Sequence, residues 1–183
     1  MAPARIKRMR LTGKHRDLFL FAAIVLFLCA CSTRQTAQHT PPAPADIAAI
    51  EAGNATALRQ IIVNSATQQI GQPYRWGGQT PGTGFDCSGL SLFAHQQAGI
   101  AIPRRALDQY HSGRPIRRDE LKPADLVFFS NPKYSKTFHV GVYIGRDQFV
   151  HAPGKGRTVT TASLSNPYFN TNFIGAKTHI PHF

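Results

Sequence analysis

Between residues 56 and 111, the chain contains segments in which apolar positions repeat at helical spacing. The first segment repeats at Leu58, Ile61, Ile62, Ala66 and Ile70. It predicts a helix over residues 56–70 that ends at Gly71. The second segment repeats at Leu90, Phe93, Ala94, Gln97 and Ala98. It predicts a second helix that stops at Gly99, and a shorter pattern over residues 106–111 predicts a third.

From residue 126 onward the pattern changes to short apolar or alternating runs that are typical of strands. These runs cover residues 126–129, 138–144, 149–152, 158–161 and 173–179. Turns are predicted at residues 121–125 and 145–148. Because helices come first and short antiparallel strands come after them, the chain is predicted to be an α+β protein. Its N-terminal helices would pack on one face of an antiparallel β-sheet.

The N-terminus has the pattern of an export signal. A basic stretch that reaches Arg16 precedes an apolar run at residues 18–28. This run is short for a membrane span of about 20 residues and typical of a secretory signal peptide. The sequence Leu28-Cys29-Ala30-Cys31-Ser32 resembles a bacterial lipobox, with Cys31 as the acylated residue. An uncleaved single-pass anchor is the alternative, and both arrangements export the C-terminal domain.

The lipobox resemblance divides the chain into three parts. Residues 1–30 would be a lipoprotein signal peptide, and Ser32 after the cysteine implies sorting to the outer membrane. Residues 31–45 would be the lipidated Cys31 and a flexible, Pro-rich tether. Residues 46–183 would form the folded domain.

The charge of the chain is strongly basic but unevenly placed. The net charge is +12, and six of the 21 lysines and arginines lie in residues 1–30 against one of the nine acids. The rest of the chain therefore carries +7. This excess is not arranged as a tight basic run interleaved with aromatics, so it does not indicate nucleic-acid binding. A hydrophobic content of 42% is enough for a real core.

Cys87 is the first candidate for chemistry. Asp86 before it is a natural helix N-cap, which puts Cys87 on the first turn of the second predicted helix. The positive end of the helix dipole favours the thiolate, the nucleophilic form of cysteine. The alternative is a buried, inert thiol. If Cys29 leaves with the signal and Cys31 carries lipid, Cys87 has no disulfide partner, and an exported unpaired thiol is a liability unless it has a role.

A cysteine nucleophile needs a base, and the base needs a group that orients it. His139 and His151 lie on adjacent predicted strands. They share a face of the sheet only if the hairpin between them has an odd loop or a bulge, which would pair His151 with Gly141. We predict that odd loop or bulge, because a regular two-residue turn would put the two rings on opposite faces.

Other histidine arrangements are less favourable. A zinc site from Cys87, His139 and His151 lacks close ligand spacing and a fourth ligand. The remaining histidines show no spacing signal and are predicted to lie at the surface: His39, His95, His111, His179 and His182.

Several motifs in this order resemble those of the NlpC family of bacterial cell-wall cysteine peptidases. The matching segments are Tyr74-Arg75-Trp76-Gly77-Gly78, Asp86-Cys87-Ser88-Gly89-Leu90, Ile102-Pro103-Arg104, residues 121–129, residues 139–145 and Phe149-Val150-His151-Ala152. The resemblance is greatest to outer-membrane lipoprotein murein endopeptidases, and it implies a reduced papain-like fold. Two departures are Ala124, where the family has glycine in a Pro-Gly-Asp turn, and Arg105, where a serine or threonine often caps the next helix.

The resemblance also implies roles for particular residues. Cys87 would be the nucleophile, His139 the base and His151 the polar third member. Tyr74 would place its hydroxyl near the oxyanion, whereas Asp86, Ser88 and Arg104 would lie in the substrate groove. No metal or cofactor is implied.

The implied function is hydrolysis of peptide bonds in peptidoglycan stem peptides, with the membrane reached through the lipid on Cys31. The bond would be the D-Ala–diaminopimelate crosslink or the D-Glu–diaminopimelate bond. Two alternatives stay open at this point. One is a non-catalytic peptidoglycan-binding module on the same fold, and the other is a thiol acyltransferase or amidase that acts on another substrate.

Overall fold

The computed structural model describes residues 44–130 and 138–181. The predicted signal peptide, Cys31 and most of the predicted tether lie outside the described residues. Within the part of the chain that the structure describes, no helix is both long enough and apolar enough to cross a membrane.

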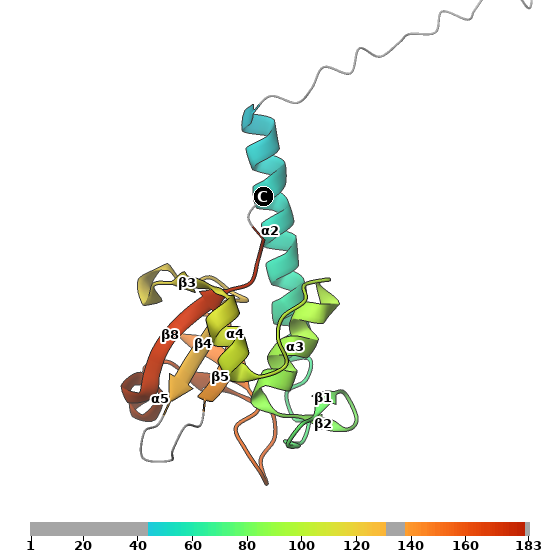
Figure 1. The fold of residues 1–183 in the computed structure, drawn as a ribbon, viewed down its shortest axis with the longest axis vertical. Helices are drawn as coiled ribbons and strands as arrows, with labels where there is room; N and C mark the ends of the chain where they lie inside the picture. The colour runs from blue at the N-terminus through green and yellow to red at the C-terminus, as the bar shows by residue number, and fades with distance from the viewer. Residues whose placement is uncertain (1–43, 131–137, 182–183) are drawn as a thin grey trace, which may run out of the picture. The chain divides into compact units, whose positions relative to one another are not determined.

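The helices in the first half of the domain follow the predicted order (Figure 1). They are α2 (Pro44–Thr67), α3 (Cys87–Gln97) and α4 (Ala106–Ser112). The start of α2 lies well before the predicted residue 56, because the preceding residues are rich in alanine but have no clear apolar period. Their high helix propensity favours the extension of the helix. Gly71 and Gly99 follow α2 and α3 with φ of 93° and 71°, as expected of glycines that end helices.

The second half forms a six-stranded antiparallel sheet in the order β3-β8-β4-β5-β6-β7. Its strands are β3 (Arg114–Ile116), β4 (Leu126–Ser130), β5 (Phe138–Gly145), β6 (Gln148–His151), β7 (Thr160–Ser163) and β8 (Phe173–Thr178). The α+β prediction is therefore confirmed. The sequence pattern missed β3, the 3-10 helix Arg118–Glu120, the helix α5 (Pro167–Asn172) and the short ladder of β1 (Gln79–Thr80) with β2 (Gly84–Phe85).

The alternation of side chains in the sheet divides the core into two clusters. On one face, Phe128, Val140 and Val142 pack with Leu90 and with buried residues of α2. On the other face, Val127, Phe129 and Phe149 form a smaller cluster with Leu164, against which Phe169 of α5 packs. The sheet is thus covered on both faces: the N-terminal helices pack on one face, as predicted, and α5, which the sequence did not predict, packs on the other. The difference arises because α5 is too short to show a helical period.

The two departures from the family pattern each have a local structural consequence. Ala124 has a φ of 76°, so it adopts the left-handed conformation that glycine adopts without strain. Its N–H donates to the carbonyl of Tyr143 at 2.7 Å, which ties the turn to β5. Arg105 occupies the N-cap position of α4, and its side chain makes no capping hydrogen bond.

Candidate active site

Cys87 is the first residue of α3, as predicted. The N-cap Asp86 accepts a hydrogen bond from the Gly89 N–H at 2.7 Å, which satisfies one of the free donors of the first turn. Gly89 lies under the loop that precedes the helix, and a Cβ at this position would clash with the carbonyl of Gly78. The close approach therefore places the loop of residues 72–78 directly against the turn that carries the thiol.

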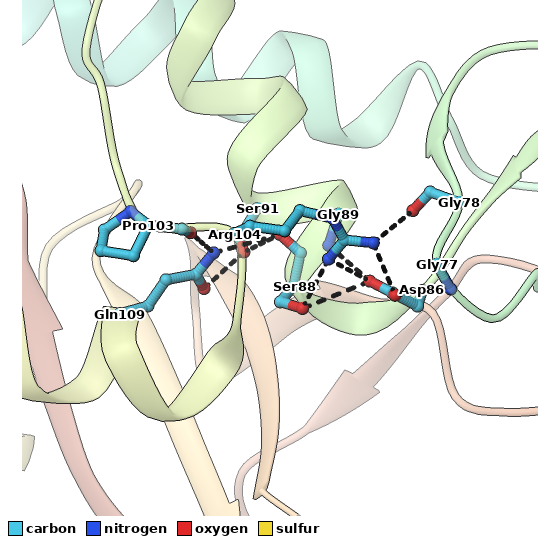
Figure 2. A network of polar contacts seen from close by, with 9 residues as sticks. All are labelled: Gly77, Gly78, Asp86, Ser88, Gly89, Ser91, Pro103, Arg104 and Gln109. Carbon is cyan, nitrogen blue, oxygen red and sulfur yellow. Dashed lines mark hydrogen bonds and ion pairs between the residues drawn. The ribbon is translucent and has the colours of Figure 1, made fainter.

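The carboxylate of Asp86 is the centre of a network of polar contacts (Figure 2). Besides Gly89, it accepts from the Gly77 N–H at 2.9 Å and from Arg104, whose Nη2 is 2.7 Å from Oδ2. Arg104 also donates to the hydroxyl of Ser88 at 3.0 Å. Because these donors occupy both oxygens of the buried Asp86, its carboxylate holds the loop, the helix and Arg104 together.

Gln109 of α4 extends this network behind the helix. Its Nε2 donates to the carbonyls of Ser88 at 3.1 Å and of Pro103 at 2.8 Å. Its Oε1 accepts from the hydroxyl of Ser91 at 2.8 Å. Gln109 thereby ties the first turn of α3 to the segment that carries Arg104, so the position of Cys87 is braced from two sides.

Burial dominates the pKa of the Cys87 thiol. It raises the pKa above its ordinary value, and the charge of Asp86 raises it further. Backbone N–H groups of Val140, Ser88 and Cys87 itself lower it, but they do not compensate for desolvation. The donors at the helix start therefore favour the thiolate, as expected, but in the unbound protein the loss of water outweighs them and the pKa of the thiol stays above its ordinary value.

The core packing locates the thiol. Cys87 packs against the core cluster that contains Val140, the residue after His139 on β5. Helix α3 packs on β5 through the shared core. The fold therefore brings the helix that carries the thiol to the strand that carries the predicted base.

The hairpin of β5 and β6 contains the predicted bulge. The turn itself has two residues, Arg146 and Asp147, with φ of 51° and 63°. The register shifts by one residue between Tyr143 and Gly145, so that Val142 pairs with Val150. In this register His151 lies on the same face as His139, and Nε2 of His139 is 2.8 Å from Nδ1 of His151.

Both imidazoles are held in the neutral form. Burial lowers the pKa of His139 to about 4. Burial, followed by the neighbouring His139 and Arg157, lowers the pKa of His151 to about 3. A neutral imidazole can accept a proton from the thiol, so the histidine pair meets the first requirement of a general base.

Tyr74 lies close to the thiol from the other side. A bridge between Tyr74 and Phe85 holds it beside the strand that leads into Asp86. Burial raises the pKa of its hydroxyl, and the charges of Cys87 and Asp86 raise it further. The hydroxyl is therefore a neutral donor near the sulfur. Trp76 in the same loop is 87% exposed and packs in neither core cluster.

A cavity of about 700 Å³ borders the two histidines. Its described lining residues are Phe129, His139, His151, Pro153, Gly154, Lys155, Arg157, Asn166, Tyr168 and Phe169. Apart from the histidines, none of them was predicted from the sequence as a site residue. Most come from the loop after β6 and from the start of α5, neither of which has a periodic pattern or a motif that would have indicated a site.

The other histidines do not all lie at the surface. His95 is fully buried on α3, where its Nδ1 is 2.9 Å from the carbonyl of Ser91, and burial lowers its pKa to about 4. The prediction for His95 was therefore wrong, because it sits among the helices and not on the outer face of α3. His111 is exposed and His179 is half-buried, whereas His39 and His182 lie outside the described residues.

The candidate reactive groups are the thiol, the two imidazoles, which contact each other, and the tyrosine hydroxyl near the thiol. Among the described residues, no three side chains of histidine, cysteine, aspartate or glutamate are placed to hold a metal ion.

This fold and site define a known class of protein. The NlpC/P60 family profile matches residues 71–178, which contain Cys87 and both histidines, so the chain belongs to the NlpC/P60 family. A crystal structure of an NlpC/P60 family protein from Bacillus cereus has the same fold, with a TM-score of 0.63 and 31% identity. The match covers 67% of this chain and 40% of that one.

Two relatives carry more specific names. The chain is 45% identical over 121 residues to murein DD-endopeptidase MepH of Escherichia coli, covering 64% of this chain and 45% of that protein. It is 39% identical over 117 residues to gamma-DL-glutamyl hydrolase of Bacillus subtilis, covering 63% of this chain and 28% of that protein. The chain thus spans less than half the length of either relative.

We expect the free energy of unfolding to fall as the pH drops from about 6.5 toward about 4. The folded-state pKa values of His139 and His151 lie below the ordinary value, so the unfolded chain takes up protons first. Each histidine then contributes a slope of up to about 1.4 kcal/mol per pH unit in this window. Urea unfolding across the window should show a shallower slope for the variant with both His139→Asn and His151→Asn. If the free energy of unfolding changes with pH by the same amount in this variant and in the wild type, His139 and His151 are not held in the neutral form.

We also expect Cys87 to be a protonated thiol in the resting protein. Because burial raises its pKa above 9.0, its alkylation by iodoacetamide should speed up continuously as the pH approaches that value. Peptide mass spectrometry distinguishes Cys87 from Cys29 and Cys31, and the chain unfolded in urea provides the reference titration. A rate that reaches its plateau below about pH 7 would show a thiolate in the resting protein and refute this expectation.

Proposed function

We propose that this chain is a peptidoglycan endopeptidase that cuts peptide bonds of murein stem peptides with Cys87 as the nucleophile. The observation that carries the proposal is the contact of 2.8 Å between His139 and His151 on the strands beside α3. It supplies a base and an orienting group next to the helix that carries the thiol. The family and the name of the Escherichia coli relative, a murein endopeptidase, support the same class of substrate.

In the proposed mechanism, His139 meets His151 through Nε2 and exchanges protons with the thiol through Nδ1. The proton of the Cys87 thiol passes to His139 as the sulfur attacks the peptide carbonyl carbon, and the carbonyl oxygen becomes an oxyanion. The hydroxyl of Tyr74 and the backbone N–H of Cys87 would donate to that oxyanion. Donors of this kind typically lower the barrier by about 3 kcal/mol each.

In the second half of the proposed mechanism, the proton that His139 took from the thiol is passed on. Protonated His139 donates it to the leaving amine, so the peptide C–N bond breaks and a thioester with Cys87 remains. Water then attacks the thioester while His139 accepts its proton, and the thiol is released. The depressed pKa values of the histidine pair agree with this cycle, because the base must be neutral before each attack.

The residues around Asp86 have an indirect role in the proposal. Asp86, Ser88 and Arg104 hold the first turn of α3 against the loop that carries Tyr74. They would therefore form the wall of the substrate groove. They would also keep the Cys87 sulfur and the Tyr74 hydroxyl in fixed positions relative to each other. We favour the D-Ala–diaminopimelate crosslink as the bond, in agreement with the name of the Escherichia coli relative.

The deciding experiment is digestion of purified sacculi by the full-length chain, with the fragments identified by mass spectrometry. We expect Cys87→Ala and His139→Ala to lose activity by a factor of about 1,000 or more, because the residues of such a unit act together. His111→Asn, which changes an exposed histidine outside the site, should retain activity.

Each other outcome of the digestion would have a definite meaning. Intact muropeptides with the wild-type protein would favour a non-catalytic binding module. Cleavage that survives Cys87→Ala would refute the thiol mechanism. Fragments cut between D-Glu and diaminopimelate would show that this bond, and not the crosslink, is the one that the protein cuts.

We further propose that the chain is an exported lipoprotein on the periplasmic face of the outer membrane, anchored through Cys31. The support is the lipobox-like sequence and the basic and apolar segments before it. In a bacterial host fed with labelled palmitate, the wild type and Cys29→Ala should take up label, whereas Cys31→Ala should not. Label that persists on Cys31→Ala would place the lipid elsewhere or refute the anchor.

A further inference from the structure

The cavity beside the histidines lies where the proposed reaction releases its leaving group. Both His139 and His151 line it. In the proposed mechanism His139 gives its proton to the leaving amine, so the part of the substrate that departs with the amine must lie next to this ring. A volume of about 700 Å³ accommodates a group the size of an amino acid with its neighbours.

The described lining of this cavity carries positive charge and no compensating acid. Lys155 and Arg157, both exposed, lie in the loop that follows β6. Of the described residues that line the cavity, none is an aspartate or glutamate, and neither cation forms an ion pair within the described part of the chain. The two cations are therefore available to a ligand with negative charge.

The positive charge of Arg157 lies close to the histidine pair of the proposed mechanism. Arg157 is close enough to His151 to lower the pKa of that imidazole. The backbone N–H of Arg157 donates to the carbonyl of Gly154, and its carbonyl accepts from the N–H of Tyr74, so its loop is held on both sides. The positive charge thus lies beside the histidine pair and on a loop whose backbone is braced against the loop of Tyr74.

The remaining lining residues suit a ligand that combines polar groups with aliphatic carbon atoms. Asn166 caps α5 through its side-chain oxygen, which accepts from the Tyr168 N–H at 3.0 Å. Phe169 and the half-exposed Tyr168 provide aromatic surface in the same lining. Such a cavity combines apolar walls with a few charged groups, as small-molecule sites commonly do.

We propose that Lys155 and Arg157 bind a carboxylate in the leaving half of the substrate, on the carbon that bears the released amine. This inference rests on the proposed endopeptidase function and makes it more specific. At the D-Ala–diaminopimelate crosslink, the carbon that bears the acylated amine also bears a free carboxylate. A lysine at the same position of the crosslink has no such group. The two cations would therefore select diaminopimelate-type crosslinks.

The test compares two crosslinked peptides that differ only in this carboxylate, one free and one converted to the carboxamide. The wild-type protein should cleave the free acid with a kcat/KM about tenfold or more higher, because a charge-assisted contact is lost with the amide. Lys155→Met and Arg157→Gln should lower kcat/KM about tenfold for the acid and leave the amide within about twofold. Added salt should reduce the preference of the wild type.

Matched charge removals outside the cavity provide the control. Lys122→Met and Arg114→Gln each remove one exposed cation that does not line the cavity, and both should keep the wild-type preference. Equal cleavage of the acid and the amide by the wild type would overturn the inference. An equal loss on both substrates in the Lys155 and Arg157 variants would also overturn it.

A binding measurement keeps the inference independent of turnover. Free meso-diaminopimelate, titrated into Cys87→Ser and followed by NMR, should shift the resonances of His139 and His151. The shifts should disappear when Lys155→Met and Arg157→Gln are added. Failure of the wild type to cleave either peptide would refute the proposed function, whereas unchanged histidine resonances in the titration would refute the carboxylate site.

Discussion

The carboxylate of Asp86 is the contact on which the arrangement of the site depends. It caps α3, accepts from the loop at Gly77 and pairs with Arg104. Without it, the first turn of the helix, the loop of Tyr74 and the segment before α4 would have no common anchor. Because the thiol is on the next residue, a small rotation of this turn would move the sulfur away from β5.

Burial dominates the electrostatics of the site. The helix N-terminus and neighbouring N–H groups act on Cys87 in the direction that favours a thiolate, yet the net effect on its pKa is upward. The same loss of water lowers the pKa values of His139 and His151. The thiol and the two imidazoles therefore rest in their neutral forms. In this resting state the thiol is protected, because a protonated sulfur reacts slowly with oxidants.

Periodicity predicted the elements whose residues repeat regularly. The helices α3 and α4 and the central strands β4, β5 and β6 occur close to where the pattern indicated. The pattern missed short or irregular elements, such as α5 and β3, because a few residues are too short for a period to emerge. It also placed His95 at the surface, since one residue of a helix cannot show by itself which neighbouring helices will cover it.

The sequence by itself determined the order of the candidate reactive groups: a capped helix that begins at Cys87, and two histidines on paired strands after it. It also determined that a bulge was required to bring the histidines to one face, because strand alternation has a strict period of two. The tertiary structure alone decided the protonation state of these groups and the cavity beside them. Both depend on how much water is excluded and on which distant loops meet, such as those of Lys155 and Tyr168, and long-range packing of this kind leaves no local pattern in the chain.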